Sequence, residues 1–156
     1  MSKTRDVAGL AGWVIVAFTA AAIGSQFMPD VWYESLAKPS WNPPNSVFGP
    51  VWTVLYTMMG TAAWLVWRRG GFRGGSVALV LFGSQLVLNA AWSYLFFGAH
   101  YIGYALLDIV ALLVLIVMLI WRFGRIDRRA GWLMVPYAAW VAFATALNAS
   151  IWQLNR

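Results

Sequence analysis

The sequence predicts an all-α integral membrane protein, built as a single bundle of five transmembrane helices. Composition is the first reason: 62% of the 156 residues are hydrophobic and only 10% are charged, whereas a soluble domain averages about 25% charged residues. The second reason is that five long apolar runs follow one another along the chain. Each run has about the 20 residues that a helix needs to cross the hydrocarbon core of a bilayer.

The five apolar runs form one predicted domain that covers residues 1–156. The runs comprise about residues 7–28, 48–67, 76–97, 103–121 and 130–153, and an outer loop covers residues 29–47. The first run follows two basic residues, as in a signal peptide, but it is long for one, and we expect a retained helix. Arginine-rich residues 68–75 and 122–129 connect the second run to the third and the fourth to the fifth. Connections this short predict antiparallel neighbours.

Basic residues are distributed unevenly over the two ends of the predicted bundle. One end holds nine of the 11: Lys3, Arg5, Arg68, Arg69, Arg73, Arg122, Arg125, Arg128 and Arg129. The other end holds Lys38 and Arg156. Because basic residues are enriched in cytoplasmic loops, we expect the N-terminus and both basic connections in the cytoplasm, and the loop around Trp41 and the C-terminus outside. This placement accounts for the net charge of +6 without a nucleic-acid partner.

The residue types present exclude several kinds of site. The chain has no cysteine, so disulfides and thiolate metal sites are excluded. It also has no carboxylate pair, Ser–His arrangement, histidine cluster or phosphate-cradling glycine loop, and its one histidine, His100, falls in a short predicted outer loop. We therefore expect no metal site, no obligatory cofactor and no conventional catalytic constellation.

Four predicted helices place polar or aromatic side chains at a similar depth, in the half of the bundle next to the outer loop. They are Trp52, Tyr56, Gln85, Asn89, Trp92, Asp108, Trp140 and Asn148, and the small residue Ala144 lies on the same face of its helix as the last two. This coincidence, estimated from the rise of 1.5 Å per residue, predicts a ligand site. The amides can instead serve as hydrogen-bond partners between helices. Asp108 can likewise form a structural bond, although ionisable residues within spans are functional candidates.

Small residues and prolines have structural uses of their own. Alanine stripes on the first and fifth helices, and Gly83 on the third, leave room for close contact within the bundle or across a dimer. Prolines at 39, 43 and 44 stiffen the outer loop. The loop can hold an aromatic lid over the helix ends, formed by Trp32, Tyr33, Trp41 and Asn42, or it can merely cap those ends.

Several motifs rich in tryptophan, proline and asparagine follow one another along the chain. In the outer loop and second helix, the motifs are Lys38-Pro39-Ser40-Trp41-Asn42-Pro43-Pro44 and Phe48-Gly49-Pro50-Val51-Trp52. Further along they are Gln85-Leu86, Leu88-Asn89 and Trp92, then Ala105-Leu106 and Asp108, Pro136-Tyr137 and Trp140, and Ala144-Thr145 and Leu147-Asn148. Together these motifs resemble the TspO/MBR family of translocator and tryptophan-rich sensory proteins, and the likeness covers nearly the whole chain in the same order.

The resemblance implies a five-helix bundle, commonly a homodimer, that binds tetrapyrroles such as protoporphyrin IX and haem beneath the first loop. Carried over by motif, the pocket lining falls on Trp52, Tyr56, Asn89, Trp92, Trp140 and Ala144. Mitochondrial relatives also bind cholesterol, but their motif needs an aromatic residue where this chain has Ala149. Sterol binding is therefore not expected, and the resemblance favours a bacterial inner-membrane protein.

Three functions are compatible with these observations. The first is a sensor or carrier that binds a tetrapyrrole. The second is an enzyme-like activity, in which light and oxygen degrade the bound porphyrin; Trp52 and Trp140 are its candidate catalytic residues. The third is a transporter, against which stand the single intramembrane charge and the lack of an inverted repeat.

Overall fold

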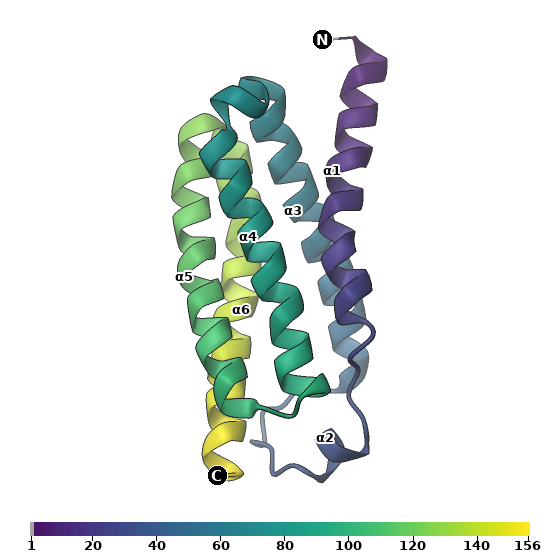
Figure 1. Cartoon of the computed structure of the whole chain (residues 1–156), viewed down its shortest axis with the longest axis vertical. Coiled ribbons are helices and arrows are strands. Elements are labelled where there is room, and N and C mark those ends of the chain that lie inside the picture. The colour runs from purple at the N-terminus through teal and green to yellow at the C-terminus, as the bar shows by residue number, and fades with distance from the viewer. Residues whose placement is uncertain (1) are drawn as a thin grey trace.

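The computed structural model describes residues 2–156, which form a bundle of long helices with no strand in that part of the chain. The elements are α1 (Lys3–Gly24), α2 (Val31–Ser35), α3 (Asn45–Gly74), α4 (Ser76–Ser93), the π-helix η1 (Tyr94–Gly98), α5 (Ile102–Ile126) and α6 (Arg128–Leu154). Helices α1, α3, α4, α5 and α6 run along the bundle, and the short α2 lies at the end where the chain terminates (Figure 1). We call this end the α2 end.

Four of the long helices are long and apolar enough to cross a membrane: α1, α4 together with η1, α5 and α6. Helix α3 is the longest, with 30 residues, but tryptophan, threonine and glycine dilute its apolar composition. The protein is therefore an all-helical integral membrane protein.

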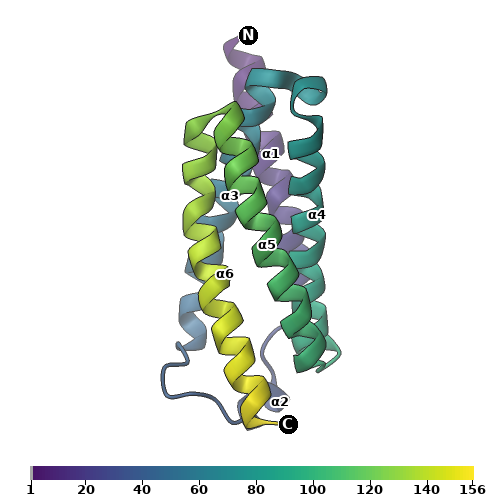
Figure 2. The same cartoon turned by 90° about the vertical axis from the view of Figure 1, so that its left-hand side faces the viewer.

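The five long helices form a ring. Helix α5 packs most extensively on α6, and around the ring α6 contacts α3, α3 contacts α1, α1 contacts α4, and α4 contacts α5. The expected pairing of consecutive helices is weakest between α3 and α4. The last turns of α3 bend across the end of the bundle instead (Figure 2), at Gly71, whose φ of 58° is a conformation that favours glycine.

The predicted helix boundaries were wrong at both arginine-rich segments. Residues 68–75 are not an extended loop, because α3 continues past Arg68 and Arg69 to the kink at Gly71 and ends at Gly74. Helix α5 likewise continues through residues 122–126. Arginine is a good helix former, so the drop in hydropathy does not end either helix. The first helix also ends earlier than predicted, at Gly24, and α2 forms within the loop over 29–47.

Asp127 joins three helices at the end opposite α2. Its carboxylate is buried and accepts hydrogen bonds from Arg69 Nε on α3 at 2.6 Å and from the Arg129 backbone N–H at 2.9 Å. The second bond caps α6. Burial alone would raise the pKa of this carboxyl, but the hydrogen bonds and positive charges of Arg69 and Arg129 outweigh it, so the pKa lies below its ordinary value.

Candidate ligand-binding site

A cavity of about 500 Å³ lies between α1, α3, α4 and α6, in the half of the bundle nearer α2. Helix η1 and the segment that leads to α2 complete its wall. The volume falls within the range of roughly 300–1,000 Å³ that is typical of small-molecule sites. The cavity therefore occupies the region where the sequence predicts a ligand site.

Most of the predicted site residues line this cavity. They are Trp52, Tyr56, Asn89, Trp92, Trp140, Ala144 and Asn148 from the helices, and Tyr33 from α2. Asp108, Trp32, Trp41 and Asn42 are not among the lining residues. Asp108 is separated from the cavity because α5 packs on α4 and α6 and contributes no lining residue.

Large aromatic residues form the wall, and small residues leave the space. Trp52 packs against Tyr56 with ring centroids 5.5 Å apart, and Phe48 packs edge-on against Trp140 at 5.9 Å. Ala21, Gly24, Gly49 and Ala144 face the same space. The small residues of α1 thus help to form the hollow as well as a helix contact.

Sequence reasoning missed the apolar part of the lining. It includes Phe18 on α1, Phe27 and Met28 in the following loop, Phe48 on α3, and Phe96 and Phe97 in η1. A phenylalanine on an apolar helix gives no contrast that would separate a cavity position from a core or lipid-facing one. The π-helix also shifts the register of Phe96 and Phe97, and no feature of the sequence indicates this shift.

The polar groups beside the cavity form a chain of hydrogen bonds. The Tyr56 hydroxyl donates to Asn89 Oδ1, Asn89 Nδ2 donates to the Tyr137 hydroxyl at 2.8 Å, and that hydroxyl donates to Gln85 Oε1 at 2.8 Å. All four residues are buried. The structure thus shows that Gln85 and Asn89 form hydrogen bonds between helices, which is one of the two uses expected for them.

Two tryptophans in the cavity wall differ in their hydrogen bonding. Trp92 Nε1 donates to Asn148 Oδ1 at 3.0 Å, and Asn148 Nδ2 donates to the backbone carbonyl of Ile102 at 3.1 Å. Trp140 Nε1 is buried and has no partner among the residues that the structure describes. A buried donor without a partner is costly, so a ligand with an acceptor near Trp140 would be stabilised.

Tyr33 closes the cavity at the α2 end and is held in place by the loop. Its hydroxyl donates to Asn42 Oδ1 at 3.3 Å, and Lys38 Nζ donates to its backbone carbonyl at 2.6 Å. Burial raises the pKa of the Tyr33 hydroxyl, and the hydrogen bond to Asn42 offsets part of this rise. The hydroxyl therefore stays protonated at neutral pH and remains a donor.

The other predicted lid residues fasten the loop to its surroundings. Trp32 stacks on the ring of His100 with centroids 3.9 Å apart and an angle of 11°, while Asp30 Oδ2 lies 3.7 Å from His100 Nε2. Trp41 packs edge-on against Phe143 at 5.6 Å. These contacts attach the loop to α6 and to the connection between η1 and α5.

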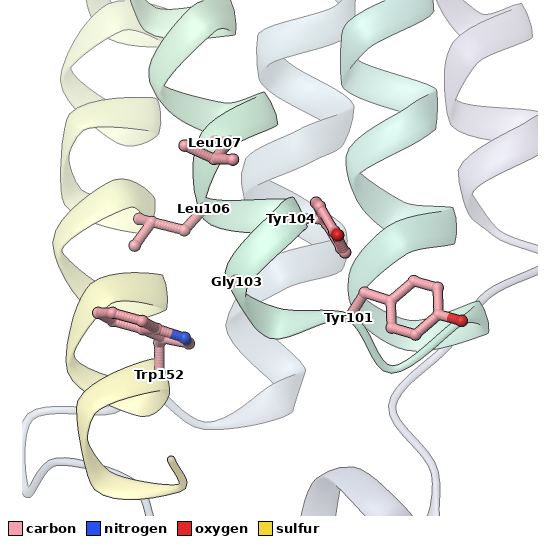
Figure 3. A pocket seen from close by; sticks show the side chains of 6 residues that line it. All are labelled: Tyr101, Gly103, Tyr104, Leu106, Leu107 and Trp152. Carbon is pink, nitrogen blue, oxygen red and sulfur yellow. The ribbon is translucent and has the colours of Figure 1, made fainter.

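A second hollow of about 470 Å³ lies on the surface of α5 and α6. Its lining comprises Tyr101, Gly103, Tyr104, Leu106, Leu107 and Trp152. Figure 3 shows the two tyrosines on the opposite side of α5 from Trp152, so the polar groups do not converge on one point. This groove lacks the set of convergent polar groups that identifies a specific site.

Comparison with known proteins agrees with the motifs. The model of the TspO/MBR family matches residues 9–153. The chain is 46% identical over 136 residues to the tryptophan-rich protein TspO of Chlorobaculum tepidum, which covers 85% of this chain and 86% of that protein. It is 39% identical over 149 residues to the human translocator protein, covering 92% and 88%. It is 38% identical over 135 residues to the tryptophan-rich sensory protein of Cereibacter sphaeroides, covering 86% and 84%. The chain belongs to the TspO/MBR family.

Proposed function

We propose that the protein is a membrane sensor or carrier that binds tetrapyrroles, such as protoporphyrin IX or haem, in the cavity beneath the α2 loop, by which we mean the outer loop over residues 29–47 that contains α2. The observation that carries this proposal is the cavity itself: about 500 Å³, with Trp52, Trp92 and Trp140 among the residues that line it. Flat apolar macrocycles suit aromatic walls, because offset and edge-on ring contacts add to the area that they bury. We infer that Trp140 Nε1, a buried donor with no partner among the described residues, donates to an acceptor such as a propionate when the ligand is bound.

The proposed membrane arrangement has five spans. At 1.5 Å per residue, the 30 residues of α3 are long enough to cross the bilayer beside the four more apolar helices. The N-terminus and the two basic connections would then face the cytoplasm of a bacterial inner membrane, with the α2 loop and the C-terminus outside. We also propose that two copies of the chain associate as a homodimer in the membrane.

The direct test is a titration of the purified protein in detergent with protoporphyrin IX in the dark, followed by porphyrin absorption and tryptophan fluorescence. Ala144→Leu fills the cavity and should weaken binding at least about ten-fold, while Trp140→Phe removes one hydrogen bond and should cost about five-fold. Matched controls on the same helix are Ala142→Leu and Trp132→Phe, because both residues are exposed. Equal, non-saturating binding by all variants would show that porphyrin merely partitions into micelles, and the proposal would be lost.

A light-dependent activity is the second candidate, because two oxidisable indoles, Trp52 and Trp140, line the same cavity. The porphyrin-loaded protein would be illuminated in air and its products separated by chromatography. A defined product whose yield falls in Trp52→Phe at unchanged affinity would support this activity. The same products from porphyrin in empty micelles would indicate ordinary photobleaching.

A further inference from the structure

We propose that the cavity selects ligands that offer an N–H or O–H donor to Tyr56, and that Met59 sets this preference through a chain of hydrogen bonds. The inference deepens the proposed function, because it concerns which chemical groups the same cavity accepts. It rests on the hydrogen-bond chain that runs from the cavity wall into the centre of the bundle.

The chain begins at the cavity and ends in the core. Tyr56 and Asn89 line the cavity, whereas Tyr137, Gln85 and Met59 do not. The last three have no exposed surface, so water cannot supply alternative partners. Gln85 Nε2 lies 3.7 Å from the sulfur of Met59, which closes the chain.

The direction of every hydrogen bond in the chain follows from this sulfur. A thioether accepts hydrogen bonds but cannot donate one. The amide nitrogen of Gln85 therefore faces Met59, which turns Gln85 Oε1 toward Tyr137. This oxygen can only accept, so the single proton of the Tyr137 hydroxyl is committed to it.

The same reasoning fixes the direction of the two hydrogen bonds between Tyr137 and the cavity. The Tyr137 oxygen must accept its other bond, so Asn89 turns its Nδ2 toward Tyr137. Asn89 Oδ1 then faces Tyr56 and accepts the only proton of that hydroxyl. Toward the cavity, Tyr56 is left with lone pairs and no proton, and a ligand can hydrogen-bond to its oxygen only by donating.

An opposite polarity would be available without the methionine. If Gln85 turned its amide nitrogen toward Tyr137, the Tyr137 proton would pass to Asn89, and Asn89 would donate to Tyr56. The Tyr56 hydroxyl would then be free to donate into the cavity. Met59 opposes this arrangement because it would break the hydrogen bond from Gln85 Nε2 to the sulfur and place two acceptors, the Gln85 oxygen and the Met59 sulfur, against each other.

The test uses carbazole and N-methylcarbazole, two flat aromatic probes that differ in one N–H donor. Binding to the full-length protein in detergent is measured by isothermal titration calorimetry, and the quantity of interest is the ratio of the two Kd values. Because micelle partitioning is the same for each variant, it cancels when ratios are compared. In Tyr56→Phe the preference for carbazole, expressed as the ratio of the two Kd values, should fall about five-fold, which corresponds to the loss of one hydrogen bond.

Gln85→Met tests the direction of the hydrogen bonds without changing a residue that contacts the ligand, because Gln85 does not line the cavity. The variant keeps the side-chain length but replaces the amide oxygen that accepts from Tyr137 with a thioether, a much weaker acceptor, so the Tyr137 proton passes to Asn89. We expect the carbazole preference to fall as far as in Tyr56→Phe. Leu86→Met, the control at the next position of α4, should keep the wild-type ratio. A wild-type ratio in Gln85→Met or in Tyr56→Phe, or no saturable binding of carbazole, would overturn the inference.

The porphyrin titration distinguishes this inference from the proposed function. If protoporphyrin IX fails to bind while the carbazole ratios change as expected, the donor preference stands and the tetrapyrrole assignment fails. If porphyrin binds saturably but the ratios do not change, the cavity is a tetrapyrrole site without the polarity proposed for Tyr56.

Discussion

The substitution Gly60→Ala tests how closely α1 approaches α3. A Cβ atom at Gly60 would lie 2.5 Å from Val14 Cα and 2.9 Å from both the Trp13 carbonyl oxygen and the Val14 nitrogen. Carbon atoms in ordinary contact are about 3.5–4.0 Å apart. All three neighbours are backbone atoms, so no side chain can rotate away, and α1 would have to move by about 1 Å.

The expected cost follows from two opposing effects. Overpacking a well-packed core costs about 1–3 kcal/mol, and the rigid backbone neighbours place Gly60→Ala near the upper end. Alanine is the better helix former by about 1 kcal/mol, which leaves a net loss of about 2 kcal/mol. The control is Gly83→Ala, because no atom lies within 4 Å of a Cβ built there. It should leave stability unchanged or raise it by up to about 1 kcal/mol.

The free energy of unfolding can be measured by circular dichroism in mixed micelles of dodecyl maltoside and sodium dodecyl sulfate. Porphyrin affinity gives a second readout, because α1 carries Phe18, Ala21 and Gly24 of the cavity wall and their displacement should weaken binding. If Gly60→Ala were as stable as Gly83→Ala and bound porphyrin normally, the two helices would not approach as closely as the structure indicates.

Substitutions at three further positions give distinct results. Asp127→Ala should lower stability by about 2 kcal/mol, about half from the lost helix cap and half from the ion pair with the half-exposed Arg69, whereas Asp127→Asn keeps the cap and should cost less. Because the pKa of Asp127 in the folded protein lies below its ordinary 3.8, its charge stabilises the fold at neutral pH, and melting temperatures of wild type and Asp127→Asn should converge as the pH falls through this depressed value. Gly131→Ala would place a Cβ 2.8 Å from a backbone Cα of α5, and its melting temperature should fall. Trp32→Leu removes the stack on His100 and should speed porphyrin dissociation, measured by stopped-flow fluorescence.

Much of the fold could be predicted from composition because a membrane helix depends mainly on its own residues. About 20 apolar residues are enough to predict a span, and the ring of long helices was found where the apolar runs lie. Helix ends depend on other signals. Arg68 and Arg122 lower the hydropathy without ending a helix, whereas Gly71 and Asp127 mark the real bend and the real cap.

The sequence predicts how deep in the bundle the site residues lie, but not toward which neighbouring helices their side chains point. Counting residues along each helix placed Trp52, Asn89 and Trp140 at the level of the cavity, and all three line it. The same counting included Asp108, which is not among the lining residues. Depth depends on one helix alone, whereas the direction of a side chain depends on which helices surround it. The arrangement that leaves α5, and with it Asp108, out of the cavity wall could not be predicted from the sequence.

The two glycines and the methionine show the same limit at the level of single atoms. Gly60 and Gly83 have the same intrinsic freedom, yet only Gly60 lies against the backbone of another helix, so only there does the absence of a side chain permit packing. Met59 would pass for an ordinary core residue until Gln85 is found within reach of its sulfur. Its lack of a donor then determines which way a tyrosine on the cavity wall directs its proton. Glycine lacks a side chain and methionine lacks a hydrogen-bond donor wherever they occur. The neighbouring helix determines whether that lack permits close packing or fixes the direction of a hydrogen bond.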